Sequence, residues 1–417
     1  MRMFRSWPAV LCWLTVLLDG YDLVVLGAVI PTLLDRQHLG FTAASATVAA
    51  TISLIGVAIG AVASGPIADR YGRRRTLLAS VAVFSIATIA VPLSPSIAVF
   101  DTWRLIGGIG LGACMPSALT LMAEFSPANR RATSSTVTMT GYHAGAVATS
   151  LVALAFIPDW EIIFYVGGIA GLILLPVMWF KLPESQAFLA ASRGDKPARV
   201  SISSLFSGGF ARTTIGIWVG SFMGLLLVYG LNTWLPKLMR DAGYSLATSL
   251  TLLLMLNVGA ITGLLIAGAV ADRRGTKVTM LCWFTASAIL LALLSVRVPN
   301  AVALNALVFV TGMFVFSAQV LVYAYVTQAY PATVRATALG LAAGVGRLGA
   351  IMGPTITGAL IANGSGHPWG FYMFAVVAAV GAIALSIVPR LSSGTTESVP
   401  LDDSIVSSPS ANSPAGH

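Results

Sequence analysis

Charged residues are scarce in this chain, and cysteines are few. Asp, Glu, Lys and Arg make up only 9% of its 417 residues, whereas a soluble domain carries about a quarter. Hydrophobic residues make up 57% and fall in long uninterrupted runs, so too few polar side chains remain to cover a water-facing surface of this size. The same runs exclude a collagen-like or disordered chain. The composition therefore predicts an integral membrane protein.

The three cysteines do not indicate a metal site or a disulfide framework. Cys12, Cys114 and Cys282 each stand alone in an apolar run, without a C-x-x-C or Cys/His cluster, which favours small core residues. The sequence also lacks a recognisable nucleophile–base arrangement or cofactor-binding motif. We therefore expect no enzyme activity, no metal and no bound cofactor.

Twelve apolar runs are long enough to cross a bilayer as helices of roughly 20 residues. The first run is too long for the core of a cleaved signal peptide, so we expect it to be retained as a membrane span. The predicted spans cover residues 9–34, 46–68, 76–96, 98–123, 133–157, 161–181, 213–239, 249–271, 278–298, 301–326, 336–362 and 368–390.

The basic residues are distributed unevenly between the two sides of these spans. One set of loops carries most of the Lys and Arg residues, and the other carries only Arg36, Lys237, Arg240 and Arg297. By the positive-inside rule the richer side is cytoplasmic, and both termini lie on it. The net charge of +9 therefore orients the chain in the lipid bilayer and does not indicate nucleic-acid binding.

The two halves of the chain repeat each other. Residues 65–74, GPIADRYGRR, return as residues 268–277, GAVADRRGTK, and residues 127–133, PANRRAT, return as residues 331–337, PATVRAT. Both repeats are displaced by nearly the same number of residues. This pattern predicts an all-α membrane protein whose 12 transmembrane helices form two pseudo-symmetric six-helix bundles.

The repeat and the composition also predict how the chain is divided. The expected parts are an N-terminal bundle at residues 1–181, a cytoplasmic central loop at 182–212, a C-terminal bundle at 213–390 and a disordered cytoplasmic tail at 391–417. The tail is expected to be disordered because it has too few bulky apolar residues to bury a core.

These motifs resemble those of a known family. The Gly-x-x-x-Asp-Arg-x-Gly-Arg-Arg pattern of residues 65–74 is similar to the loop signature of the major facilitator superfamily, and residues 104–112, RLIGGIGLG, resemble its second motif. Within that superfamily, residues 19–22, DGYD, resemble the mark of the aromatic acid:proton symporters. The resemblance implies the major facilitator fold and proton-coupled import of a small aromatic carboxylate, of the benzoate or hydroxybenzoate type, by alternating access. It also implies a monomer in a bacterial inner membrane, with protons as the coupling ion.

Three charged residues are predicted to couple transport to protons. Ionisable side chains within apolar spans are rare, because each costs at least about 2.5 kcal/mol at the bilayer centre. Asp19 and Asp22 share one helical face, and two carboxylates so close in a low dielectric are not both ionised easily. The helical rise places Asp22 level with Arg104, which is a partner for Asp22 or an anchor for an anionic substrate. The alternative is an ion pair that only holds two helices together.

Arg347 and His143 occupy equivalent positions in the two halves, near the bilayer midplane. The Arg347 guanidinium suits bidentate capture of a substrate carboxylate. His143 is predicted to bind that carboxylate, to relay the proton, or both. The alternatives are that Arg347 snorkels towards the membrane surface or bonds to backbone carbonyls, and that His143 bonds to a neighbouring helix.

Polar and aromatic residues of the seventh and tenth spans are further candidates for the substrate site. Aromatic faces and amide groups suit a planar ring with a polar substituent. The alternative is plain packing, and Trp234 is also a candidate membrane-interface anchor. The predicted lining residues are Tyr229, Asn232, Trp234, Gln319 and Tyr323.

The repeated loop motif is predicted to form a cytoplasmic gate. Glycine permits close helix approach, and the two aspartates are expected to pair with helix ends or basic residues when that side is shut. Orientation by positive charge alone explains the arginines but not the repeated aspartates. The predicted gate comprises Gly65, Asp69, Arg70, Arg73, Asp272 and Arg273.

Three other functions compete with this interpretation. Residues 182–185, LPES, resemble a sugar-porter motif, but the seventh span lacks a glutamine-rich stretch. A drug:proton antiporter usually carries a Gly-Pro motif in its fifth span, whereas Gly353 and Pro354 lie in the eleventh. A membrane sensor that binds aromatic acids without moving them is disfavoured, because the tail has no recognisable output domain.

Overall fold

The computed structural model describes residues 7–125, 131–185, 188–189, 205–206, 210–330 and 332–389. Within these residues all regular secondary structure is helical. Twelve of the helices are long and apolar enough to cross a membrane, and each coincides with one predicted span. The prediction of an all-α membrane protein with twelve transmembrane helices is confirmed.

The helices form two successive sets of six. The first set is α1 (Trp7–Asp35), α2 (Ala43–Tyr71), α3 (Arg73–Ala90), α4 (Ile97–Glu124), α5 (Arg131–Phe156) and α6 (Trp160–Lys181). The second set is α8 (Ala211–Asp241), α9 (Leu246–Arg274), α10 (Thr276–Leu293), α11 (Ala301–Ala329), α12 (Ala332–Ala362) and α13 (Trp369–Ser386). Two short 3-10 turns, η2 (His38–Gly40) and η3 (Val91–Leu93), lie in the loops after α1 and α3.

Local capping residues set several helix starts. A capping box begins α2, in which Thr42 Oγ1 accepts from Ser45 N and Ser45 Oγ accepts from Thr42 N. Ser96, Ser245 and Asn300 cap α4, α9 and α11 through their side-chain oxygens. Such caps satisfy backbone N–H groups that have no partner within the helix. Some helices therefore begin before the apolar run from which the span was predicted.

Two glycines form tight turns that repeat between the two sets. Gly72 joins α2 to α3 with a φ of 97°, and Gly275 joins α9 to α10 with a φ of 87°. Side chains are strained at such positive φ, so both turns favour glycine. The matching turns lie in the repeated loop motif, as expected for two pseudo-symmetric halves.

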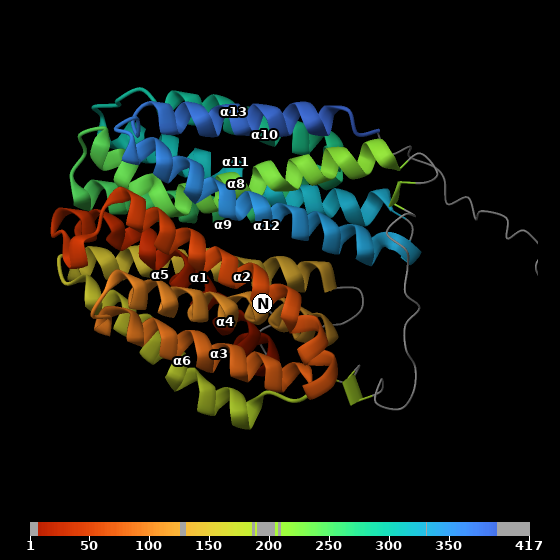
Figure 1. Ribbon diagram of the computed structural model, residues 1–417. Helices are drawn as coiled ribbons and strands as arrows, with labels where there is room; N and C mark the ends of the chain where they lie inside the picture. The colour runs from red at the N-terminus through yellow and green to blue at the C-terminus, as the bar shows by residue number, and fades with distance from the viewer. Residues whose placement is uncertain are drawn as a thin grey trace, which may run out of the picture.

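The two sets form bundles that lie side by side (Figure 1). The first bundle, α1–α6, runs from red to yellow-green, and the second, α8–α13, runs from green to blue. Between them α5 packs against α9, α2 against α12 and α1 against α8. The first two pairs are equivalent under the repeat, because α2 corresponds to α9 and α5 corresponds to α12.

One end of this contact, here called the Asp35 end, is held by polar contacts between the bundles. Arg240 Nη1 lies 2.7 Å from Asp35 Oδ2 and joins the ends of α8 and α1. The hydroxyls of Thr51 and Thr355 lie 2.9 Å apart and join α2 to α12. The bundles are therefore closed against each other at this end.

The opposite end, here called the Gly72 end, leaves more space beside the helices. Four glycines inside the helices of this end have no atom of another segment within 4 Å of the place where a side-chain carbon would sit. They are Gly65, Gly268, Gly340 and Gly344. By contrast, a side-chain carbon at Gly358, near the Asp35 end of α12, would collide with Thr47 of α2. The helices of the two bundles thus approach each other more closely at the Asp35 end.

Part of the predicted organisation falls outside the described residues. Most of the predicted central loop at 182–212 lies there, as does the whole predicted tail at 391–417. The predicted division into four parts therefore stays a prediction.

Candidate functional site

Asp22 and Arg104 form an ion pair inside the N-terminal bundle. Arg104 Nη1 of α4 lies 3.4 Å from Asp22 Oδ2 of α1, and each side chain is only 4% exposed. Thr88 of α3 completes the group, because its Oγ1 lies 2.5 Å from Asp22 Oδ1. The structure thus brings together the two charges that the helical rise places at one depth.

Asp19 lies one turn before Asp22 on α1, and one of its carboxylate oxygens is unsatisfied. The residue is 2% exposed, and its Oδ2 atom is buried without a hydrogen bond among the described residues. The two carboxylates act on each other electrostatically, as expected for neighbours on one helical face. Because an unpartnered buried polar atom is costly, Asp19 is suited to take up a proton or to face a ligand.

Arg347 of α12 projects towards Tyr229 of α8. Its Nη1 atom donates a hydrogen bond to Tyr229 Oη at 3.1 Å, and this phenol is its one hydrogen-bond partner in the described part of the chain. The guanidinium also acts electrostatically on Asp19 and on Tyr323 of α11. Since a guanidinium has five N–H donors, Arg347 retains donors for a further acceptor. The alternative of bonds to backbone carbonyls is not observed in the described residues.

His143 of α5 begins a chain of polar side chains that crosses to the other bundle. Its Nδ1 atom lies 3.0 Å from Asn257 Oδ1 on α9, and Asn257 Nδ2 donates to Asn232 Oδ1 on α8 at 3.0 Å. The Asn257 oxygen can only accept, so His143 Nδ1 carries the hydrogen of this contact. In the neutral ring Nε2 is then a hydrogen-bond acceptor. The contact also matches the alternative reading of His143 as a link to a neighbouring helix.

Aromatic rings surround His143. Tyr142 and Phe316 pack nearly perpendicular to its ring, with centroid distances of 5.1 and 4.8 Å. Tyr142 is also within electrostatic range of Asp19 and Arg347. The imidazole therefore packs against Tyr142, which lies within electrostatic range of both Asp19 and Arg347, at the junction of the two bundles.

The remaining predicted lining residues lie in different surroundings. Gln319 is 4% exposed and donates through Nε2 to Ser221 Oγ at 3.2 Å, whereas its Oε1 has no partner among the described residues. Tyr323 lies within electrostatic range of the Arg347 guanidinium. Trp234 is 0% exposed and donates through Nε1 to the backbone oxygen of Pro354 at 2.9 Å. This buried contact packs α8 against α12, which matches the alternative of plain packing for Trp234.

A small cavity lies beside Arg104, between the bundles. Its volume is about 10 Å³, which is room for about one water molecule and not for an aromatic ring. Two of its lining residues have a polar atom, Ser53 Oγ and Arg104 Nε, that is buried without a hydrogen-bond partner among the described residues. The lining consists of Leu23, Leu26, Ala50, Ser53, Leu54, Arg104, Tyr229 and Thr233. Binding of a ring at this cavity therefore requires the helices to separate.

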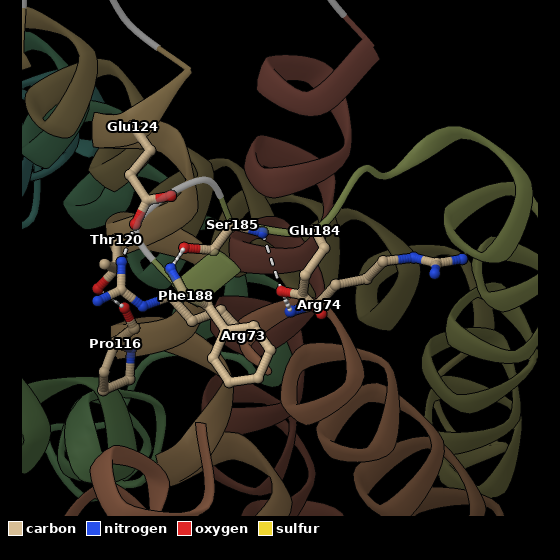
Figure 2. Close-up of polar contacts among 8 residues, drawn as sticks. All are labelled: Arg73, Arg74, Pro116, Thr120, Glu124, Glu184, Ser185 and Phe188. Carbon is tan, nitrogen blue, oxygen red and sulfur yellow. Dashed lines mark hydrogen bonds and ion pairs between the residues drawn. The ribbon is translucent and has the colours of Figure 1, made fainter. Parts of the chain in front are cut away.

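At the Gly72 end, the start of α3 is tied to the segment that follows α6 (Figure 2). Glu184 Oε1 accepts hydrogen bonds from the backbone N–H groups of Arg74 and Ser185, both at 2.9 Å. Glu184 thereby satisfies an N–H group in the first turn of α3, which has no partner within the helix. The Arg74 guanidinium also donates to the backbone oxygen of Trp179 in α6. These bonds fix α3 and α6 together at this end.

Arg73 points away from Arg74 and joins α3 to α4. Figure 2 shows the Arg73 guanidinium directed towards Glu124, and the two side chains form an ion pair. Both are partly buried. Of the predicted gate residues, Arg73 is thus bound within its own bundle.

The other predicted gate residues are exposed at the Gly72 end. Asp69, Asp272 and Arg273 make no hydrogen bond or ion pair within the described ranges, and all three are exposed. The Arg70 guanidinium lies over the ring of its neighbour Tyr71, 5.4 Å from the ring centroid. Among the described residues, the repeated aspartates therefore have no partner in this arrangement.

Three residues of these networks are not among the site residues predicted from the sequence. Thr88 carries no signal, because a buried threonine in a helix commonly bonds to the carbonyl four residues before. Asn257 is likewise an isolated amide, and no spacing in the sequence indicates that it meets His143. Glu184 stands in the Leu-Pro-Glu-Ser motif. The sequence does carry a signal for Glu184, because this acid directly follows a span and lies on the same side as a basic loop.

Comparison with known proteins identifies related chains. This chain matches the Major Facilitator Superfamily over residues 12–266 and 252–411. It is 32% identical over 405 residues to a gallate transporter of Pseudomonas putida, with 90% of each chain covered. It is 30% identical over 415 residues to a benzoate transport protein of Acinetobacter baylyi, with 91% of this chain and 88% of the relative covered. The crystal structure of a D-xylose-proton symporter is similar in fold, with a TM-score of 0.74 at 19% identity over 92% of this chain and 97% of that chain.

Proposed function

Because this chain belongs to the Major Facilitator Superfamily, among its aromatic acid transporters, we propose that it is a proton-coupled symporter. It is a multi-pass membrane protein and a transporter rather than an enzyme. The proposed substrate is a small aromatic carboxylate of the benzoate or hydroxybenzoate type. It enters the cell with protons by alternating access.

The single observation that carries the proposal is the arrangement of Asp19 and Arg347. A buried carboxylate with one unsatisfied oxygen lies within electrostatic range of a guanidinium whose hydrogen-bond partner is a phenol. The two residues come from different bundles, so movement of the bundles changes the distance between them. A negative substrate fits the free donors of Arg347, and a proton fits Asp19 or Asp22.

The substrate ring is proposed to lie between Arg347 and His143. Its carboxylate binds the guanidinium, and the phenol of Tyr229 directs that guanidinium. Aromatic neighbours such as Tyr142 and Phe316 supply ring contacts of the kind that planar ligands favour. His143 Nε2, as an acceptor, suits a ring hydroxyl better than a second carboxylate oxygen.

The membrane potential explains why a proton is needed. An aromatic acid is an anion at neutral pH, and a potential that is negative inside opposes its entry by about 2.3 kcal/mol per 100 mV. One co-transported proton cancels this cost, and a second proton makes the potential favour entry. The proposed proton carrier is Asp19 or Asp22, and Arg104 is the fixed charge that the Asp22 carboxylate faces.

The uneven contact between the bundles supports alternating access. We propose that the Gly72 end faces the cytoplasm of a bacterial inner membrane, with both termini on that side, and that the chain works as a monomer. The closed Asp35 end then makes this an inward-facing state. In the opposite state, the gate residues Asp69 and Asp272 would find partners as the Gly72 end closes.

Uptake of labelled 4-hydroxybenzoate and benzoate into proteoliposomes tests this function. The interior is made more alkaline than the medium, and initial rates are compared with protein-free and Asp22→Asn liposomes, because undissociated acid also crosses lipid. We expect uptake above both controls that a protonophore abolishes. Uptake equal to that of the controls for both acids would contradict the proposed substrate class.

A further inference from the structure

Thr88 makes two short contacts but has only one hydrogen to donate. Its Oγ1 atom lies 2.5 Å from Asp22 Oδ1 and 2.7 Å from the backbone oxygen of Phe84. The Phe84 oxygen can only accept. When Thr88 donates to Phe84, its contact with Asp22 is a hydrogen bond only if Asp22 supplies a proton. When Asp22 is ionised, the Thr88 hydrogen has to turn to Asp22 Oδ1.

We propose that Thr88 is the positioning residue for the coupling proton and that this proton lies on Asp22 Oδ1. In the protonated state Asp22 donates to Thr88, and Thr88 donates to Phe84. In the ionised state Thr88 donates to Asp22 instead. This inference rests on the proposed proton coupling and deepens it, because it assigns the proton to one oxygen of one acid.

Arg104 occupies the other side of the Asp22 carboxyl group. Its Nη1 atom lies 3.4 Å from Oδ2, which is longer than the 2.7–2.9 Å or so of a charge-assisted hydrogen bond. Such a long contact suits a carboxyl whose proton is held on Oδ1 by Thr88. Loss of the proton would then allow Arg104 and Asp22 to approach each other more closely.

The charged and titratable neighbours of Asp22 do not duplicate this role. Asp19 and Tyr21 lie on the same helix as Asp22. Within the described residues no hydrogen bond joins Asp19 to Asp22, and Tyr21 Oη donates to the backbone oxygen of Ile163 at 2.8 Å. From α4, Arg104 only donates, and Asp101 acts on Arg104. Thr88 is the group from α3 that reaches Asp22, and it can switch between donor and acceptor.

Replacement of Thr88 by valine keeps the side-chain shape and removes the hydroxyl. Asp22 Oδ1 then loses the Thr88 hydrogen bond in both protonation states. The ionised state is destabilised more, because an unpaired buried charge costs more free energy than an unpaired neutral group. The Thr88→Val protein should therefore retain the Asp22 proton to higher pH. The Thr88→Ser protein keeps the hydroxyl and should behave as the wild type.

Infrared difference spectroscopy of the full chain in lipid tests the inference without any substrate. The carboxylic C=O band that disappears in Asp22→Asn is followed as a function of pH. We expect its titration midpoint to rise by about one pH unit in Thr88→Val, the size of effect given by a hydrogen bond to a charged group, and to stay unchanged in Thr88→Ser. Thr357→Val is the matched control, because among the described residues this buried hydroxyl bonds only to the backbone oxygen of Gly353 on α12.

The outcomes separate this inference from the transport proposal. A midpoint in Thr88→Val equal to that of the wild type would overturn the role of Thr88, and so would an Asp22 band that does not titrate. If Thr88→Val does not yield a monodisperse protein, Thr88→Ala removes the same hydroxyl and carries the same expectation. Failure of aromatic acid uptake would refute the proposed function and leave the infrared result intact.

Discussion

Arg347 Nη1 on α12 lies 3.1 Å from Tyr229 Oη on α8, so a phenol rather than a carboxylate holds this guanidinium. A neutral partner directs the charge without neutralising it. The arrangement leaves Arg347 able to attract an anion into the junction of the two bundles. This is the physical basis for placing the substrate carboxylate on it.

Arg347→Lys should weaken substrate binding while keeping the positive charge. Lysine cannot form the bidentate contact, and loss of one charge-assisted hydrogen bond raises the KM by about tenfold or more. Tyr229→Phe should raise the KM less, because the guanidinium remains and only the hydrogen bond that orients it is lost. KM values from substrate counterflow measure both effects. Arg297→Lys, an exposed arginine at the Asp35 end, is the control, and an unchanged KM in Arg347→Lys would remove Arg347 from the site.

The stability of the protein should fall when one partner of the Asp22–Arg104 pair is replaced, and largely recover when both are replaced. Arg104→Gln leaves a buried carboxylate without its cation and is expected to cost about 3–5 kcal/mol in stability if Asp22 stays ionised. The double variant Asp22→Asn/Arg104→Gln should recover most of that loss, but not proton-driven uptake. Thermal unfolding in detergent and uptake assays measure the two properties. A double variant that accumulates substrate normally would show that the pair is structural.

Asp22→Asn alone should separate accumulation from exchange. The amide cannot carry a proton, so accumulation driven by a proton gradient should be lost. Exchange of internal for external substrate needs no net proton movement and should continue at a reduced rate. Counterflow measured beside gradient-driven uptake distinguishes the two. Equal loss of both activities would indicate a binding or folding defect instead.

His143 should contribute to discrimination between hydroxylated and unsubstituted rings. The hydrogen-bond chain through Asn257 leaves Nε2 as an acceptor, which matches a ring hydroxyl. His143→Leu should therefore reduce the preference for 4-hydroxybenzoate over benzoate by about tenfold, the effect of one hydrogen bond. The ratio of kcat/KM for the two acids is the readout. An unchanged ratio would leave His143 as a link between helices only.

A disulfide across the Asp35 end should lock the transporter. The hydroxyls of Thr51 and Thr355 lie 2.9 Å apart, so cysteines at both positions are close enough to bridge. The background is Cys282→Ser, since Cys12 and Cys114 are buried. Oxidation should stop uptake, and reduction should restore it. Full activity of the oxidised, cross-linked protein would contradict opening at this end.

The depth of charges in the membrane could be predicted from the sequence, and their partners only in part. A fixed rise per residue places Asp22 and Arg104 at one level, and they indeed lie together. The number of spans follows from apolar length alone. The repeat identifies His143 and Arg347 as equivalent positions, because in a duplicated chain equivalent residues of the two halves are separated by nearly the same number of residues.

Contacts between distant helices could not be predicted in the same way. Asn257 meets His143 only because α9 packs against α5 at that height, and no local spacing contains this information. Trp234 illustrates the reverse case, since an aromatic residue near a span end suggests a membrane interface, whereas tertiary packing buries it against α12. Nothing in the sequence distinguishes Thr88 from other helical threonines, and its role follows only from its contact with Asp22 in the structure.

The most direct test of the central claim measures proton movement with substrate. Proteoliposomes hold a pH-sensitive dye, the membrane potential is clamped with potassium and valinomycin, and 4-hydroxybenzoate is added outside at equal internal and external pH. The account predicts that the interior acidifies faster with the wild type than with Asp22→Asn, whose rate reports passive entry of the acid. Faster entry of labelled substrate with the wild type, without faster acidification, would contradict proton symport.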